Sequence, residues 1–172
     1  DIKKLVINNG VSSIGDYALL GCYKISSISL PESLERIGYS ALDPCSGLTE
    51  IDLPKNLTKL GGYSLAGGSF SFIKIPDGIS SIELYTFSGC ENLQNVELPN
   101  DLTTINEGAF NHCESLTSIH IPQKVTDIKR YAFWYCSSLT NLELPSGISK
   151  INEGTFDNCA ALSSISIPST VT

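Results

Sequence analysis

His120 has a carboxylate 23 residues away on each side, Glu97 and Glu143. If the chain repeats with that spacing, the three side chains fall on neighbouring strands. A histidine between two carboxylates could then ligate a divalent cation or respond to pH. The second histidine, His112, is out of register with this set. There is no nucleophile elbow, phosphate-binding loop or paired metal-ligand motif. We therefore predict no catalytic residue, no metal site and no cofactor, and keep weak cation binding by the triplet as a hypothesis.

The six cysteines occupy one position of a repeating unit, 14 residues after a proline or its substitute. An even number of cysteines permits disulfides, which is one interpretation. Equivalent side chains on stacked coils point the same way, however, which suits a column of free buried thiols better than disulfide geometry. No Cys-x-x-Cys pair is present, so zinc binding is not indicated. The column consists of Cys22, Cys45, Cys90, Cys113, Cys136 and Cys159.

Seven of the eight prolines mark the repeat, because each follows the previous one by 22 or 23 residues. Asn8 occupies the equivalent position one period before the first of them. A fixed period of this length is typical of stacked repeats. We therefore predict a single array over residues 1–172, with about seven repeats of 23 residues, as a segment of a longer protein without its caps. The marking prolines are Pro31, Pro54, Pro76, Pro99, Pro122, Pro145 and Pro168.

The apolar residues around each proline predict two extended elements in every coil. Ile119 and Ile121 stand three and one residues before Pro122, a spacing typical of one face of a short strand. Stacked strands of this kind predict a parallel sheet on one face of a repeat solenoid. The proline ends the strand because it has no N–H to donate. Val125 and Ile128 then predict a second short extended ladder on another side of the coil.

In the remaining part of each coil, the chain must turn back within a few residues to reach the start of the next strand. In the sixth copy this segment runs from Ala132 to Cys136, and a short helical or 3-10 turn suits it. Phe133 and its equivalents are large apolar residues at one position of this segment. We expect them to stack as a spine inside the solenoid.

The complete unit reads L-x-x-I-x-I-P-x-x-V-x-x-I-x-x-x-A-F-x-x-C, and residues 116–136 match it at every specified position. Over essentially the whole chain it resembles the BspA-like leucine-rich-repeat family. The resemblance implies a right-handed coil with a parallel sheet on one face. Members of that family are typically surface or secreted proteins of bacteria and some protists, implicated in adhesion to host proteins or other cells. The resemblance therefore implies a cell-surface or secreted module that binds a host or cell-surface protein. Because the residues assemble no catalytic site, we also predict that the chain is not an enzyme.

Charge and hydropathy exclude several classes of partner. The net charge is −7 and the pI is about 4.7, which argues against nucleic acid or an anionic membrane surface as the main partner. No apolar run approaches the roughly 20 residues that a membrane span requires. We therefore expect no nucleic-acid binding and no membrane insertion, and either a monomer or arrays stacked end to end.

Outward positions of the predicted strands are the first candidates for binding. Near the middle of the chain they carry mostly charged side chains, with Phe72 as an aromatic exception. Two interpretations stay open: the charges pair across strands on a solvated sheet, or they form a recognition strip with Phe72 as its anchor. The candidate sheet-face residues are Glu50, Asp52, Phe72, Lys74, Glu97, His120 and Glu143.

A second candidate surface is aromatic and comprises His112, Tyr131, Trp134 and Tyr135. Trp134 is the only tryptophan, and other copies mostly hold polar residues at its position. Aromatic side chains on a solvent-facing position are typical of interfaces. The alternative is that they cover the turn and pack on one another. The sequence thus predicts a binding or adhesion module, with a structural spacer that displays other domains as the alternative.

Overall fold

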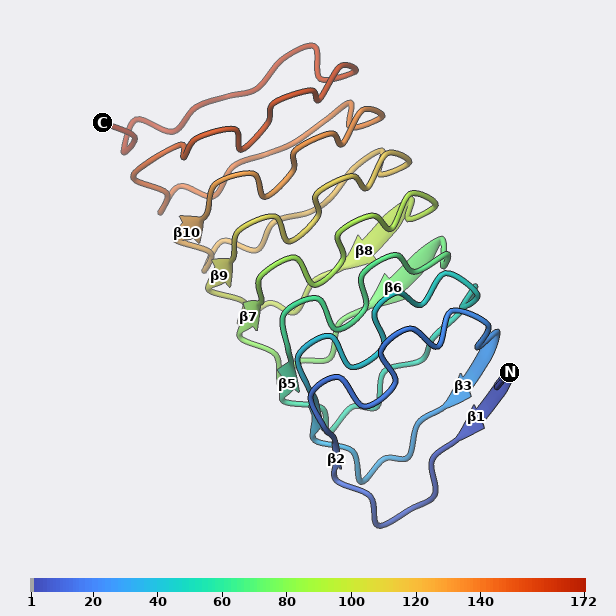
Figure 1. Ribbon diagram of the computed structural model, residues 1–172. Helices are drawn as coiled ribbons and strands as arrows, with labels where there is room; N and C mark the ends of the chain where they lie inside the picture. Colours follow the sequence, from blue (N-terminus) through green and yellow to red (C-terminus); the bar gives the residue numbers. More distant parts are fainter. Residues whose placement is uncertain (1) are drawn as a thin grey trace.

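The computed structural model describes residues 2–172, which form a stack of coils (Figure 1). Every strand pair is parallel. Paired residues such as Leu5 and Ile28, or Ile14 and Ile37, lie one repeat apart in the sequence. The predicted repeat solenoid is therefore confirmed.

One side of the stack, which we call the strand face, carries the strands that precede the prolines. Buried and exposed side chains alternate along them: Ile73 is fully buried between the exposed Phe72 and Lys74. The parallel sheet is present, but within residues 2–172 it is interrupted. Beyond residues 95–97, the last strand on this face, the sheet continues as isolated parallel pairings of Ser118 with Asn141 and of Glu143 with Ser166. The paired strands are β1 (Lys4–Val6) with β3 (Ser27–Ser29), and β6 (Phe72–Lys74) with β8 (Asn95–Glu97).

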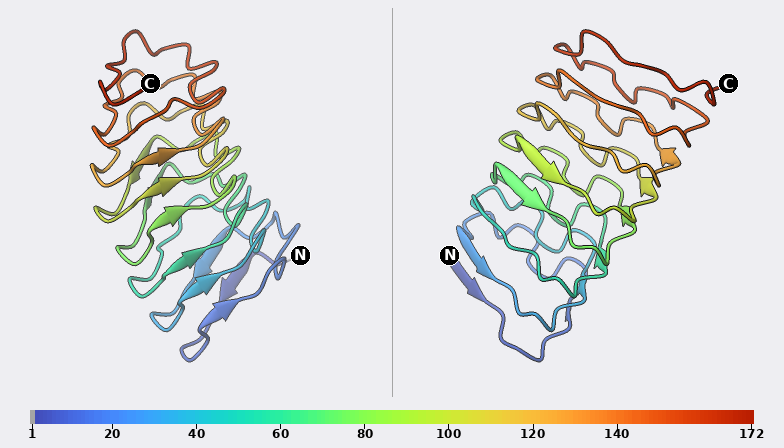
Figure 2. Two further views of the ribbon diagram at one scale, coloured as in Figure 1. Left: turned by 90° about the vertical axis from the view of Figure 1, so that its left-hand side faces the viewer. Right: turned by 180° about the vertical axis from the view of Figure 1, so that it is seen from behind.

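A second side carries the short ladder that the sequence predicts. Each of its strands has two residues, and the second of them is buried. Figure 2 shows these strands in a row on a different side from β1, β3, β6 and β8. The strands form two sheets, β2 (Ser13–Ile14), β4 (Arg36–Ile37) and β5 (Lys59–Leu60), and β7 (Ser81–Ile82), β9 (Thr104–Ile105) and β10 (Asp127–Ile128).

The third side, which we call the turn face, contains no helix within residues 2–172, so the predicted helical or 3-10 segment is wrong. Separate turns replace it, such as the one in which the Trp134 amide donates to the Tyr131 carbonyl at 3.1 Å. Tyr131 and Tyr135 have φ values of 57° and 59°, and equivalent residues in other coils are also left-handed. That conformation cannot continue a right-handed helix. No helix in the described chain is long and apolar enough to cross a bilayer.

Phenylalanine side chains stack through the middle of the array, as the sequence predicts. Phe87, Phe110 and Phe133 have no exposed surface, and neighbouring ring centroids are 5.5 Å apart. The ring planes differ by no more than 11°. Phe156 extends the row, with its ring centroid 5.9 Å from that of Phe133. Each ring therefore fills one layer of the core and contacts the layers above and below.

The cysteine column consists of free thiols, and five of its six members are buried. The Cys113 Sγ donates a hydrogen bond to the Phe87 carbonyl oxygen of the preceding coil at 3.3 Å. Burial raises the pKa of Cys45 to about 12 and that of Cys159 to about 11, because the interior disfavours the thiolate. The interpretation as buried thiols, rather than disulfides, is confirmed.

The third coil, residues 48–69, is one residue shorter than the other coils, and both ladders are interrupted beside it. In the described chain, residues 50–52 pair with neither β3 nor β6, and β5 does not pair with β7. Gly68 replaces the cysteine here because the Phe70 ring occupies the space: a Cβ on Gly68 would lie 2.1 Å from Phe70 Cε1. We call the boundary between the third coil and the fourth coil, residues 70–92, the seam.

Gly38 is required by close approach between consecutive backbones. A Cβ on Gly38 would lie 2.6 Å from the Asp16 amide nitrogen and 2.7 Å from the Gly15 carbonyl carbon. We expect Gly38→Ala to lower the free energy of unfolding by about 1–3 kcal/mol, the usual range for overpacking. Gly15→Ala is the matched control, because no atom lies within 4 Å of its Cβ. Its effect should stay within about 0.5 kcal/mol. Equal losses in urea unfolding would contradict this account of the glycine column.

Candidate functional site

The strand face exposes all seven of the sheet-face residues predicted from the sequence. They stand two or four residues before a proline, where the side chain leaves the sheet toward solvent. Phe72 is the only phenylalanine among them, and 48% of its surface is exposed. Other coils carry serine, asparagine, lysine or glutamate at the same position, so the stacking of coils does not require a phenylalanine there.

Two adjoining grooves, which we call the strand-face grooves, lie on this face at and beside the seam. The first has a volume of about 350 Å³, and its apolar lining is Ile51, Leu53, Phe72 and Pro76. Glu32, Asp52 and Lys55 also line it. The second has a volume of about 300 Å³ and includes Glu97 and His120. Lys74 and Asp77 line both grooves, so the two share a wall.

The grooves bring together five of the seven predicted sheet-face residues. Asp52, Phe72 and Lys74 line the first groove, and Lys74, Glu97 and His120 line the second. The other two, Glu50 and Glu143, are exposed but line neither groove. Glu32, Lys55, Pro76 and Asp77 were missed, because they lie at the strand ends and in the following loops, outside the alternating pattern.

Cross-strand charge pairing accounts for part of the strand face. Lys74 Nζ lies 3.0 Å from Glu97 Oε2, so the predicted pairing is confirmed for this pair. Both side chains are more than half exposed, and such a pair typically contributes about 1 kcal/mol or less. No group of three or more metal-ligating side chains occurs within residues 2–172. The hypothesis of a cation site formed by Glu97, His120 and Glu143 is therefore wrong.

The predicted aromatic residues do come together on the turn face. The His112 and Tyr135 rings stack with centroids 4.6 Å apart, and the Trp134 ring meets His112 edge-on at 5.2 Å. Tyr131 lies 5.9 Å from Trp134, measured between centroids. Trp134 Nε1 donates to Asp157 Oδ2 at 3.1 Å. These residues thus pack on one another, as the alternative interpretation predicts, and remain partly exposed.

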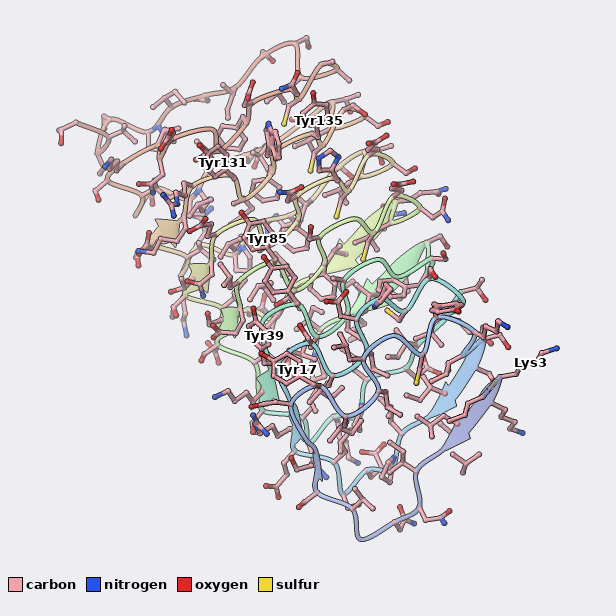
Figure 3. All side chains as sticks on the ribbon, in the orientation of Figure 1. Lys3, Tyr17, Tyr39, Tyr85, Tyr131 and Tyr135 are labelled. Atoms are coloured by element: carbon pink, nitrogen blue, oxygen red, sulfur yellow. The ribbon has the colours of Figure 1, made fainter. Side chains whose placement is uncertain are left out.

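A row of tyrosines on the same face was missed from the sequence. Tyr17, Tyr39, Tyr63 and Tyr85 follow one another with ring centroids 5.0 to 5.6 Å apart. Figure 3 shows Tyr17, Tyr39 and Tyr85 in line along the stack. Burial raises the pKa of the Tyr85 phenol, and the nearby Glu107 raises it further. The signal was present as recurring tyrosines, but Tyr39 stands one position before its partners in the repeat.

A further groove, of about 520 Å³, lies at the C-terminal half between the second ladder and the turn face. Its lining includes Glu107, Lys129 and Arg130. Arg130 Nε lies 2.8 Å from Glu107 Oε2, and Lys129 forms an ion pair with Asp127. Among the described residues that line this groove Leu84 is the only apolar one, and no exposed aromatic side chain stands beside it, so the strand-face grooves are the better candidate site.

Solved structures of bacterial leucine-rich repeat proteins have the same fold. One from Bacteroides ovatus is 32% identical with a TM-score of 0.89, covering 99% of this chain and 44% of the other. The T. pallidum leucine-rich repeat protein is 30% identical with a TM-score of 0.81, covering 94% and 78% of the two chains. The present chain thus spans less than half of the Bacteroides ovatus chain.

A leucine-rich cell surface protein from Faecalibacterium prausnitzii is more distant, at 24% identity and a TM-score of 0.53. That match covers 96% of this chain and 59% of the other, and it shows the fold alone. No curated protein sequence matches.

The family model is that of the BspA type leucine rich repeat region, and it matches residues 1–70 and 58–172 with six copies. The repeated aliphatic columns are the ones that the fold pairs in register, as Leu5 with Ile28 and Ile82 with Ile105. The chain therefore belongs to the BspA-type leucine-rich-repeat family.

Proposed function

We propose that this chain is a protein-binding module that recognises a host or cell-surface protein through its strand face. The observation that carries the proposal is Phe72, a half-exposed aromatic residue at the edge of an apolar groove on an otherwise polar sheet. Burial of such a side chain against a partner supplies the kind of central anchor that dominates protein interfaces. Repeat solenoids provide extended surfaces of this type.

The proposal includes adhesion by a cell-surface or secreted protein. Its support is the family, together with the similarity in fold to a Faecalibacterium prausnitzii protein described as a leucine rich cell surface protein. The site argues for binding rather than catalysis, because its histidine, His120, is exposed and has no ion-pair partner within residues 2–172. An open surface of this kind can hold a partner, whereas catalysis requires an assembled site of specific chemical groups.

Surface plasmon resonance against a panel of purified extracellular-matrix and cell-surface proteins tests the proposal. We expect at least one partner to bind, and Phe72→Ser to weaken that binding about ten-fold or more, as loss of an interface anchor does. Trp134→Ala, on the turn face, should leave binding within about two-fold. Loss of binding in Trp134→Ala alone would move the interface to the turn face. Absence of any partner at micromolar concentration would favour a structural spacer.

A further inference from the structure

We propose that the strand-face grooves take a short extended segment of the partner protein, with an apolar side chain beside Phe72 and basic side chains on either side of it. This inference rests on the proposed function and names the chemistry of the partner. It follows from the apolar lining of the first groove, the unpaired charges around it and the spacing of the coils.

The apolar position is set by the first groove. Ile51 and Pro76 are buried, Leu53 is half-buried, and Phe72 stands exposed at the edge. The groove volume of about 350 Å³ falls in the range of about 300–1,000 Å³ that is usual for ligand pockets. An aliphatic or aromatic side chain placed there would cover Phe72 and remove apolar surface of both molecules from water.

The charge of the partner is set by the carboxylates of the same groove. Glu32, Asp52 and Asp77 line it and have no ion-pair partner in the described part of the chain. Lys74 is paired with Glu97, and Lys55 is the cation of the lining that has no ion-pair partner among residues 2–172. Three unpaired carboxylates against one unpaired lysine make the groove negative, in line with a chain of net charge −7. A basic segment is therefore the complementary partner.

The extended conformation is set by the spacing of coils. The exposed strand residues that line the two grooves run from the third coil, which holds Asp52, to the sixth, which holds His120, and Glu32 lies beyond them in a loop of the second coil. Neighbouring strands of a sheet are about 4.8 Å apart, so this span is about 15 Å. An extended peptide rises about 3.3 Å per residue and places alternate side chains on one side. About five residues, read as basic-x-apolar-x-basic, therefore match the length and the pattern of the grooves.

The seam gives the location a structural cause. The first groove opens where residues 50–52 pair with neither β3 nor β6, so a continuous sheet does not fill this part of the strand face. The loop residues Lys55 and Asp77 belong to the coils on the two sides of the seam. The shortened third coil thus creates a single specific position in an otherwise repetitive surface.

Fluorescence anisotropy with three labelled peptides tests the inference: Gly-Arg-Gly-Leu-Gly-Arg-Gly, the same peptide with serine for leucine, and the same peptide with glutamates for arginines. We expect the first to bind about ten-fold or more tightly than the other two. Its affinity should fall between about 50 mM and about 300 mM salt, because exposed charges are screened.

Matched variants locate the binding. Phe72→Ser and Asp52→Lys should each weaken the arginine–leucine peptide about ten-fold or more. Asn141→Ser and Glu143→Lys make corresponding changes at the same repeat positions, away from the grooves, and should alter affinity less than about two-fold. Thermal unfolding of each variant confirms that it is folded.

The outcomes separate this inference from the proposed function. Tighter binding of the glutamate peptide, no binding of any peptide, or equal effects of Asp52→Lys and Glu143→Lys would overturn the inference. If a partner protein still binds in the plasmon resonance experiment and still depends on Phe72, the protein-binding function stands without the basic extended segment. If neither experiment shows binding through the strand face, both proposals are wrong.

Discussion

Phe110→Ala is expected to lower the free energy of unfolding by about 3–5 kcal/mol, the range for removing a fully buried phenylalanine. Its ring is fully buried between those of Phe87 and Phe133, with 5.5 Å between centroids on either side. The substitution leaves a cavity in one layer of the core and removes two stacking contacts. Because each coil contacts only its neighbours, the array loses cohesion between its two halves at that layer.

Phe156→Ala is the matched control, because the Phe156 ring belongs to the same row but is only partly buried. Urea unfolding followed by circular dichroism should show less than about half the loss found for Phe110→Ala, since less area is exposed and less cavity is left. Equal losses in the two variants would mean that the stacked row does not carry the stability of the core.

Raising the pH above about 9 is expected to destabilise the fold strongly, because the unfolded thiols ionise there and the buried ones do not. Burial raises the pKa of Cys45 from 9.0 to about 12 and holds the pKa values of Cys90, Cys113 and Cys136 well above the usual value. The contribution of the buried thiols to the free energy of unfolding is therefore fully present below about pH 9. It is lost progressively as the pH rises toward the pKa values of the thiols in the folded protein. Because several buried thiols of the column titrate in the same pH range, the loss at pH 11 is expected to be a large part of the stability of a domain, which is about 5–15 kcal/mol.

The check is urea unfolding at a series of pH values from 7.5 to 11. Each buried thiol contributes about 1.4 kcal/mol per pH unit to the slope once its unfolded form has ionised. The double variant Cys113→Ala, Cys136→Ala should therefore reduce the slope by about 2.7 kcal/mol per pH unit. An unaltered slope in the double variant would contradict the role of the column.

The repeat in the sequence was sufficient to predict most of the fold. Prolines at a fixed period predict parallel registers of the kind that joins Ile14 to Ile37, and the V-x-x-I pattern predicts the second ladder. The helical turn was wrong because its corners are left-handed at Tyr131 and Tyr135. Glycine is the residue that signals such a conformation. It stands at the equivalent positions of other coils, as Gly108 for Tyr131 and Gly89 for Tyr135, so the signal lay in the repeat column and not in the tyrosines. Coil-to-coil hydrogen bonds hold these residues there, such as the one from the Tyr135 amide to the Asp157 carbonyl at 3.0 Å.

The candidate site was predictable only in part. Period-two alternation selects outward residues on every coil alike, and so it includes Asp52 and Phe72 together with Glu143. The first groove arises from the departure of the third coil from the repeat, where Phe70 replaces the missing side chain of Gly68 in the core. The position of the groove depends on how these side chains pack in three dimensions, and the residue types at one position of the repeat do not reveal that packing.

The seam also determines how the array would respond to tension along its axis. Between the third and fourth coils, backbone hydrogen bonds on the turn face remain, donated by Tyr63, Leu65 and Gly67 to the next coil at 2.8 to 3.2 Å. The two ladders contribute no strand pairing across the same boundary in the described chain. At the seam, backbone hydrogen bonds on the turn face would therefore bear a pulling force along the axis. Extension would begin when the two coils separate at the strand face and at the second ladder, with the turn face acting as the hinge.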